Sequence, residues 1–474
     1  MLKKFNDYYL KKFNDFTETK IVKYIFVFLV FCLVLFFVYH YNISLWSDEL
    51  FSIDRTKKTL SLFDVMKRSS IVDSWPPLFY ILLHYFQILF GNSEILLRGF
   101  TFVFNILSLF ILYLFTKTLY SKKEAILSCI FFTFSPFILS YGIEVRGYSL
   151  FVLLSLLSLY FLMFFIKKEK TSYLFLFFLF AILNSLTHYF GLLLTFFQII
   201  YLMIENLKFI NKNKIVFILF LLILLIYPAI HFNSLYFKND IFRHNAVFAS
   251  TTINRNTFIL KELFPQMLFN ITNINIELSI LFLSLFFFFF TRENKSNRFI
   301  LYFVSAPLIS INLFAYFFMS FLNVRYFIFA FPLVYIMLSH FIAALTKSYF
   351  YIVTFILLIV FCINVPNIKF SDDRETVSLM KNFSKDKIAV LHSECYLIDY
   401  YLDMFDIKGY TVNDINVSKK DFNTKDIDKL IKENKYVFLI HPFKNEQRNY
   451  LFEDNFKITK ITDKLYRISD LQDY

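Results

Sequence analysis

Repeated apolar runs restrict the possible folds of this chain more than any other feature. Runs of about 16–22 residues recur from about Tyr24 to about Pro366, and each is close to the ~20 residues that cross a bilayer core as a helix. Backbone N–H and C=O groups cannot stay unpaired in lipid, so each run must be helical. The sequence therefore predicts an all-α polytopic membrane protein with about 11 transmembrane helices, within a range of about 10 to 12.

The composition and charge agree with a membrane protein. The chain is 58% hydrophobic and carries a net charge of +13. In a soluble protein that charge would suggest a nucleic-acid partner. Here the basic residues lie mostly in short loops between apolar runs, where they orient helices, so no nucleic-acid partner is expected. The four cysteines form neither a disulfide framework nor a metal-binding spacing.

Three segments are expected. Residues 1–20 carry apolar residues at helical spacing with lysines between them, which suits a basic amphipathic helix on the cytoplasmic membrane surface; a frayed basic tail is the alternative. Residues 21–369 form the transmembrane domain, whose first outer loop is 42–76. Residues 370–474 are charged, and apolar strand-like and helix-like runs alternate along them. We expect a small soluble α/β domain outside the cytoplasm.

The strand-like runs are Lys387–Leu391, Lys435–Ile440 and Lys464–Ile468, and the helix-like runs are Tyr396–Phe405 and Lys425–Asn434.

Loop charges predict the orientation. Six lysines precede or open the first span, which places the N-terminus in the cytoplasm of a cell-membrane protein. Later basic clusters are separated by pairs of apolar runs, as in hairpins that return to the cytoplasm. The loops near 141–148, 188–189, 231–277 and 323–325 then face outward, as does the chain after about 366. The run 77–90 is short for a span, so it either dips into the membrane or lies along its interface.

An adjacent pair of carboxylates is the most informative polar feature. Asp48 and Glu49 follow the first span in the segment Trp-Ser-Asp-Glu at 46–49. Placing carboxylates at a membrane surface costs free energy, so they are expected to form ion pairs or to take part in the function. Carboxylates serve as general bases or as ligands of hard divalent cations. The alternative is structural: Ser47 caps a helix and the two carboxylates lie in its first turn.

Further polar residues gather at predicted outer turns. Glu144, Arg146 and Tyr148 lie in one turn, His188 in a second and Arg325 in a third. Arginine is a good bidentate ligand for phosphate, whereas Glu144 and Arg146 could instead form a local ion pair. A neutral imidazole can bind a metal ion or hydrogen-bond to phosphate. Carboxylates and cations on one side of the membrane suit a substrate with an anionic head and a lipid tail.

Two other features leave alternatives open. The first outer loop carries Arg55, Lys57, Lys58, Lys67 and Arg68 against the orientation rule; these are candidates for an anionic ligand or ordinary solvated charges. The prolines of the segment 74–80 fit a helix entry, which explains that segment without any function.

With these residues in this order, the chain resembles the GT-C fold glycosyltransferases that include protein O-mannosyltransferases and lipid A aminoarabinose transferases. The resemblance covers roughly residues 20–345. The motifs that carry it are Trp-Ser-Asp-Glu at 46–49, Pro-Pro-Leu-Phe-Tyr at 76–80, Phe-Gly-Asn-Ser-Glu with Arg98 at 90–98, Ser135-Pro136, Glu144-x-Arg146-x-Tyr148, His188-Tyr189, and Arg325-Tyr326 with Pro332.

The resemblance implies a site as well as a fold. It implies a polyprenyl-phosphate-sugar donor, inversion at the anomeric carbon and a glycan, lipid or protein acceptor. Asp48 is then the catalytic base or is coupled to it, and Glu49 supports acceptor or metal binding. The donor phosphate is held by Arg146 and Arg325, in a site that includes Glu144 and Tyr148. His188, with Glu49, is implied as part of a divalent-metal site.

A transporter and a structural subunit are the alternatives to this enzyme. A transporter or flippase of lipid-linked or anionic substrates should carry ionisable residues near span midpoints and show internal repeats. The span interiors here are nearly free of charge, and no such repeat is visible. A structural subunit without catalysis would leave Asp48 and Glu49 replaceable. The sequence thus favours the glycosyltransferase.

Overall fold

The computed structural model describes residues 2–41, 43–72, 75–236, 294–318 and 324–345, and short segments between 351 and 469. The contacts within the chain divide it into two units. Unit 1 comprises Met1–Tyr41 and Lys58–Asn367, and unit 2 comprises Asn42–Lys57 and Ile368–Tyr474. Each unit is described by itself.

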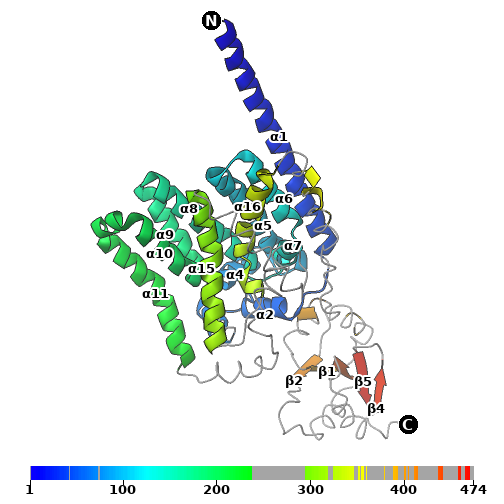
Figure 1. Cartoon of the computed structure of the whole chain (residues 1–474). Coiled ribbons are helices and arrows are strands. Elements are labelled where there is room, and N and C mark those ends of the chain that lie inside the picture. The colour runs from blue at the N-terminus through cyan, green and yellow to red at the C-terminus, as the bar shows by residue number, and fades with distance from the viewer. Residues whose placement is uncertain are drawn as a thin grey trace. The chain divides into compact units, whose positions relative to one another are not determined.

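Unit 1 is a bundle of helices (Figure 1). Its helices are α1 (Leu2–His40), α3 (Leu62–Val72), α4 (Leu78–Phe90), α5 (Glu94–Leu119), α6 (Lys122–Phe134), α7 (Pro136–Ile143), α8 (Tyr148–Lys168), α9 (Thr171–Ser185), α10 (Tyr189–Lys212), α11 (Lys214–Tyr236), α15 (Lys295–Phe318), the 3₁₀ turn η3 (Val324–Phe327) and α16 (Ala330–Ala343). The centre of the bundle is α8, which packs against α5 and α9, while α6 packs against α5 and α16.

The length and composition of the helices support a membrane protein. Among the described residues, four helices are long and apolar enough to cross a membrane, or five if the bent pair α6–α7 counts as one span. Four shorter apolar helices accompany them. The expected total of about 11 spans stays a prediction, because 237–293 and other stretches lie outside the described residues.

The N-terminal helix is longer than a single span. Residues 2–19 are helical, and they continue without a break into the apolar stretch Lys20–His40. Arg98 of α5 is fully buried, and its Nη1 donates a hydrogen bond of 3.0 Å to the carbonyl oxygen of Tyr41. A cation at this position satisfies an orphan carbonyl just after the helix end. Arg98, one of the motif residues, therefore has a structural role.

Local sequence signals set the other helix ends near the candidate site. Ser135 Oγ accepts a hydrogen bond from the Ile138 backbone N–H, and Pro136 occupies the first turn of α7. This start of a new helix produces the bend of 62° between α6 and α7. Gly91, at φ 95°, ends α4. With 13 residues, α4 is only about 20 Å long, which is shorter than a bilayer core.

Unit 2 contains a five-stranded mixed sheet of order β2-β1-β3-β5-β4. The strands are β1 (Ile388–His392), β2 (Tyr410–Asp414), β3 (Tyr436–Ile440), β4 (Lys457–Lys460) and β5 (Leu465–Ser469). The three strands predicted from apolar runs correspond to β1, β3 and β5, which are the inner strands. The outer strands β2 and β4 are more polar, as sheet edges commonly are, and the sequence reading missed them.

Unit 2 also includes the helix α2 (Ser47–Arg55), which is distant in sequence from the sheet. The hydroxyl of Tyr401, a fully buried side chain, accepts a hydrogen bond of 2.6 Å from the Leu45 backbone N–H. This bond connects positions 356 residues apart. Sequence reasoning had placed residues 42–57 with the transmembrane domain.

Several predicted features fall outside the described residues. They include most of the outer loop 231–277, the helix-like run 425–434, most of the run 396–405, and Cys395.

Candidate active site

The candidate site of unit 1 is built at the ends of helices. Trp75 precedes α4, Arg146 lies in the turn between α7 and α8, and His188 lies between α9 and α10. Tyr326 belongs to η3, the short turn before α16. The backbone N–H of Leu78 donates to the carbonyl of Leu186 at 2.9 Å, which joins the start of α4 to the α9–α10 turn.

These turns approach one another closely at Gly147. A Cβ atom at this position would lie 3.4 Å from Phe79 Cβ and 3.6 Å from Thr187 Cγ2. These are ordinary contact distances, so the glycine brings the α7–α8 turn against both neighbouring segments. The turn itself is tight, because the Arg146 N–H donates to the Glu144 carbonyl at 2.7 Å.

The ring of Trp75 lies at the centre of the site. Its centroid is 4.4 Å from that of His188, 5.9 Å from Tyr148 and 6.1 Å from Tyr326. The guanidinium carbon of Arg146 lies 5.1 Å from the Trp75 ring centroid, within cation–π range. Trp75 and Tyr326 are half-buried, whereas Tyr148 and His188 are buried. Two rings of the site are thus half-buried, and we call its buried polar residues, Arg146, Tyr148 and His188, the polar floor.

Arg146 is fixed from two sides. Besides the contact with Trp75, its Nη1 donates a hydrogen bond of 3.3 Å to the hydroxyl of Tyr80. Its side chain is only 4% exposed, and a guanidinium is expensive to bury unless its donors find acceptors. An anionic ligand would supply strong acceptors for such a group.

His188 is held in one neutral form. Its Nδ1 accepts a hydrogen bond of 3.0 Å from the Phe190 backbone N–H, so Nε2 carries the proton. Burial, Arg146 and Arg325, in that order, lower the pKa of His188 to about 3. Its ring stacks on Phe151 at 4.6 Å between centroids. Within the described part of the chain, Nε2 is buried and has no hydrogen-bond partner.

Tyr148 adds a second donor to the same floor. Its ring centroid lies 6.4 Å from that of His188, and its hydroxyl is likewise buried without a hydrogen-bond partner among the described residues. Buried polar groups are normally hydrogen-bonded, and each exception asks for an explanation. Two buried donors without a partner among the described residues, Tyr148 Oη and His188 Nε2, therefore lie near the charges of Arg146 and Arg325.

Asp48 and Glu49 lie in unit 2, in the first turn of α2. The helix begins at Ser47, so Trp46 rather than Ser47 is its capping residue. Glu49 is fully buried, and its carboxylate accepts a hydrogen bond of 3.1 Å from the Trp46 backbone N–H. This bond stabilises the helix start. Asp48 is only half-buried and is therefore the more accessible carboxylate.

The structure therefore brings together Arg146, Tyr148 and His188, and the charge of Arg325 reaches His188. Glu144 is buried in the same turn. That Asp48 and Glu49 lie close to this cluster stays a prediction, because they belong to the other unit. Sequence reasoning missed Trp75 and Tyr80 as site residues. Both lie in the segment 74–80, whose prolines had seemed to explain it fully.

The basic residues of the first outer loop are mostly solvated. Lys58, Lys67 and Arg68 are exposed. Lys57 forms an ion pair of 2.7 Å with Asp54, and the Arg55 guanidinium lies over the ring of Phe51. The exposed Lys58, Lys67 and Arg68 have the surroundings of ordinary surface charges, whereas Arg55 is buried.

Comparisons with known proteins identify the fold of this chain. The sequence model of a family described as dolichyl-phosphate-mannose-protein mannosyltransferase matches residues 74–232, a stretch that holds Trp75, Arg146 and His188. No curated protein matches the chain significantly by sequence.

Two solved proteins share the fold of this chain at low sequence identity. ArnT from Cupriavidus metallidurans, in the apo state and bound to undecaprenyl phosphate, is similar with a TM-score of 0.61 at 9% identity, over 95% of this chain and 98% of that one. The Archaeoglobus fulgidus oligosaccharyltransferase, in a complex with Zn and sulfate, is similar with a TM-score of 0.51 at 12% identity, over 94% of this chain and 73% of that one. The chain therefore has the GT-C glycosyltransferase fold that its motifs resemble.

Proposed function

We propose that this protein is a membrane glycosyltransferase that takes its sugar from a polyprenyl-phosphate donor on the outer face of the membrane. The observation that carries the proposal is the polar floor of unit 1. Two guanidinium groups adjoin two buried donors, Tyr148 Oη and His188 Nε2, that have no partner among the described residues. A phosphate has the charge and the acceptor oxygens that these groups require. The structure of ArnT with undecaprenyl phosphate supports this choice of donor.

The chemistry assigned to unit 2 completes the reaction. An acceptor hydroxyl attacks the anomeric carbon, and the bond from that carbon to the phosphate oxygen breaks with its electron pair on the leaving phosphate. Asp48 takes the hydroxyl proton as the new bond forms. Attack opposite the leaving group inverts the anomeric carbon. Glu49 holds the first turn of α2, so that the carboxylate of Asp48 keeps its position.

The residues that are expected to bind a metal ion differ in how well they suit one. Nδ1 of His188 already accepts a backbone hydrogen bond, and the two neighbouring guanidinium groups would repel a cation. His188 therefore suits phosphate better than metal. The carboxylates of α2 offer the oxygen ligands that hard divalent cations prefer. We assign any divalent metal to Glu49, so that Asp48 stays available as the base.

Ligand-induced stabilisation tests the donor site. Undecaprenyl phosphate should raise the Tm of the purified protein, since a ligand that binds only the folded state stabilises it. Undecaprenol has the same tail without the phosphate, and it should have little effect. Equal stabilisation by both lipids would show that the tail alone is recognised, and it would remove the phosphate site.

A chelator separates the two metal assignments. We expect that EDTA leaves the Tm increase caused by undecaprenyl phosphate unchanged. In our proposal the phosphate is bound by the guanidinium groups of Arg146 and Arg325 and by neutral donors, and not by a metal ion. His188→Ala should weaken that increase with or without EDTA. If EDTA abolished the increase in the wild-type protein and had no effect in His188→Ala, a metal ion at His188 would be the better account.

Tyr401 gives a prediction about the connection between the sheet domain and α2. Tyr401→Phe removes the hydroxyl that binds the Leu45 N–H, three residues before Asp48. Slight misplacement of a reacting group can lower a rate by up to about 100-fold, so kcat should fall by about 10- to 100-fold while the donor KM changes little. Tyr400→Phe is the matched control, and an equal loss in both variants would contradict a positioning role.

A further inference from the structure

The short helix α7 leads directly into the turn that carries Arg146. It has eight residues and ends at Ile143, and most of its side chains, including that of Phe137, are buried. Only Glu144 and Val145 separate the end of α7 from Arg146. Any displacement of this helix therefore moves the backbone from which the Arg146 side chain extends.

The beginning of α7 is joined to α16. The capping residue Ser135 forms a hydrogen bond of 2.5 Å between its Oγ and the hydroxyl of Tyr335, a buried residue of α16. The ring of Phe137 stacks on that of Phe331 in α16, with centroids 4.1 Å apart and planes inclined by 17°. Helix α16 follows η3, which contains Arg325. These contacts therefore link the two elements that precede and follow the arginines.

The end of α7 packs closely against α5. The side chain of Asn105, which is buried in α5, lies against the backbone of Gly142. A Cβ atom at position 142 would lie 2.9 Å from Asn105 Cγ and still closer to Nδ2, so only glycine permits this approach. One residue further, the Thr101 hydroxyl lies within hydrogen-bond distance of two carbonyl oxygens, those of Ile143 at 3.2 Å and Arg98 at 2.9 Å. Close packing at this end leaves α7 little freedom to shift.

The last turn of α7 also contacts the polar floor. The ring centroid of Tyr141 lies 5.3 Å from that of Tyr148. The charges of Arg146 and Arg325 both act on Tyr148, and the same two charges act on His188. A single phosphate can accept hydrogen bonds from both guanidinium groups only if their separation matches its width.

We propose that α7 fixes the separation of the Arg146 and Arg325 guanidinium groups. Its positioning residues are Tyr335, which holds the beginning of α7 to the helix after Arg325, and Asn105, which holds its end near Arg146. This inference rests on the proposed binding of the donor phosphate by both arginines. It adds that the two cations form a preset pair, so that less ordering is needed when the phosphate binds.

Binding of undecaprenyl phosphate measures the effect separately from catalysis. The Kd is obtained from the dependence of the Tm of the purified full-length protein on the lipid concentration. Tyr335→Phe removes one hydroxyl and should raise this Kd about three- to tenfold, which is the range of one lost hydrogen bond. At a saturating donor concentration kcat should stay near the wild-type value, because Tyr335 touches no reacting group.

Tyr120→Phe is the matched control for Tyr335→Phe. Tyr120 lies at the other end of α6 from Ser135, and its hydroxyl donates a hydrogen bond of 2.7 Å to Asn297 Oδ1. This variant also loses a hydrogen bond between elements, so it should lower the Tm of the unliganded protein by a similar amount. It should leave the Kd unchanged. An equal rise of the Kd in both variants would show a general loss of packing and would overturn the positioning role.

A double-mutant cycle with Arg325→Ala tests whether α7 acts on the arginine pair. With one guanidinium group removed there is no separation left to fix. Tyr335→Phe should then have almost no further effect on the Kd. A purely structural role of Tyr335 would give the same factor in both backgrounds. That result would overturn the inference and leave the proposed phosphate site in place.

The other end of α7 is tested by a substitution that crowds it. Gly142→Ala places a methyl group against Asn105 and should raise the Kd about tenfold by displacing α7. Asn105→Ala in the same chain makes room and should return the Kd to near the wild-type value. Gly99→Ala in α5 is the control for the methyl group, because its Cβ would lie 3.9 Å from the nearest atom, in Phe37. It should leave the Kd unchanged.

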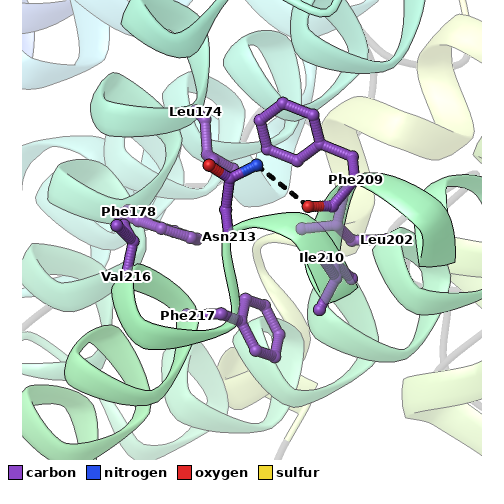
Figure 2. Close-up of a pocket in the computed structure, with 8 residues that line it drawn as sticks. All are labelled: Leu174, Phe178, Leu202, Phe209, Ile210, Asn213, Val216 and Phe217. Carbon is purple, nitrogen blue, oxygen red and sulfur yellow. Dashed lines mark hydrogen bonds between the residues drawn. The ribbon is translucent and has the colours of Figure 1, made fainter.

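Asn213→Ala is the control for this rescue. The Nδ2 of Asn213 donates a hydrogen bond of 2.9 Å to the Phe209 carbonyl oxygen, beside a small space between α9, α10 and α11 (Figure 2). This amide lies in the turn between α10 and α11, whereas Asn105 belongs to α5. Its removal should not restore the Kd of Gly142→Ala. Equal restoration by both asparagine variants, or by neither, would overturn the role of Asn105.

The wild-type measurement separates this inference from the proposed function. If undecaprenyl phosphate did not bind the wild-type protein, the proposed donor site would be wrong, and the role of α7 would be wrong with it. If the lipid bound the wild-type protein, Tyr335→Phe and Gly142→Ala with the same Kd, the donor site would stand and only the role of α7 would be overturned.

Discussion

Asp48→Asn should lower kcat by about 10²–10⁴, the range over which general base catalysis commonly contributes. An acceptor hydroxyl is a poor nucleophile at neutral pH, and a carboxylate within hydrogen-bond reach can take its proton as the bond to the sugar forms. Asparagine is nearly the same size but cannot accept that proton. The leaving phosphate needs little help from an acid, so the loss should fall mainly on this one step.

The controls for Asp48 separate chemistry from folding. Asp48→Asn should keep a normal Tm and a normal Tm increase with undecaprenyl phosphate. Glu49→Gln should reduce activity less, because its carboxylate supports the start of α2, where it accepts the Trp46 N–H. If Asp48→Asn turned over substrate at the wild-type rate, Asp48 would be only a first-turn residue of that helix.

Arg146→Ala and Arg325→Ala should raise the donor KM by about 10- to 100-fold each. Charged hydrogen bonds to phosphate contribute roughly 1.5–3 kcal/mol, which corresponds to this range. The loss should be larger for Arg146, whose guanidinium is fixed by Tyr80 and Trp75. Steady-state kinetics with a varied donor concentration measure the effect.

The matched control for the arginines is Lys67→Ala, which removes an exposed cation from the first outer loop. It should leave the donor KM unchanged. Arg146→Lys should recover only part of the loss, because an ammonium lacks the planar pair of donors. Unchanged donor kinetics in both alanine variants would remove the two arginines from the phosphate site.

The pH dependence gives a further check on His188. Because burial and two arginines lower its pKa to about 3 from an ordinary value of 6.5, the imidazole stays neutral in the folded protein across physiological pH. Its contribution to stability is present above about pH 6.5 and is lost as the pH falls from there toward 3, since the unfolded state binds the proton first. His188→Gln should flatten the decrease of Tm over this range.

The features that could be predicted from sequence are those set by local patterns. Apolar runs mark helices in lipid because the backbone has no other way to pair its polar groups. Short polar turns between them marked Arg146 and His188. The inner strands β1, β3 and β5 were predictable because buried strands are apolar. The fold itself followed from an ordered set of motifs, and the structural similarity to ArnT confirms it.

The features that were missed depend on contacts between distant residues. Nothing near Trp75 in the sequence indicates that its ring meets both His188 and Tyr326. Likewise, the hydrogen bond between Leu45 and Tyr401 joins positions that are 356 residues apart, and no local pattern indicates it. Arg98 appeared among the motifs, and only the structure shows that it binds the carbonyl just after α1.

The most direct test of the account is a transfer assay with the purified protein in liposomes. A panel of undecaprenyl-phosphate sugars is offered together with cell-envelope acceptors, and the release of undecaprenyl phosphate is measured. The wild-type protein should release it from at least one sugar donor, with the product of opposite anomeric configuration, and Asp48→Asn should not. Transfer that proceeds from nucleotide sugars but from no lipid-linked donor would contradict the central claim.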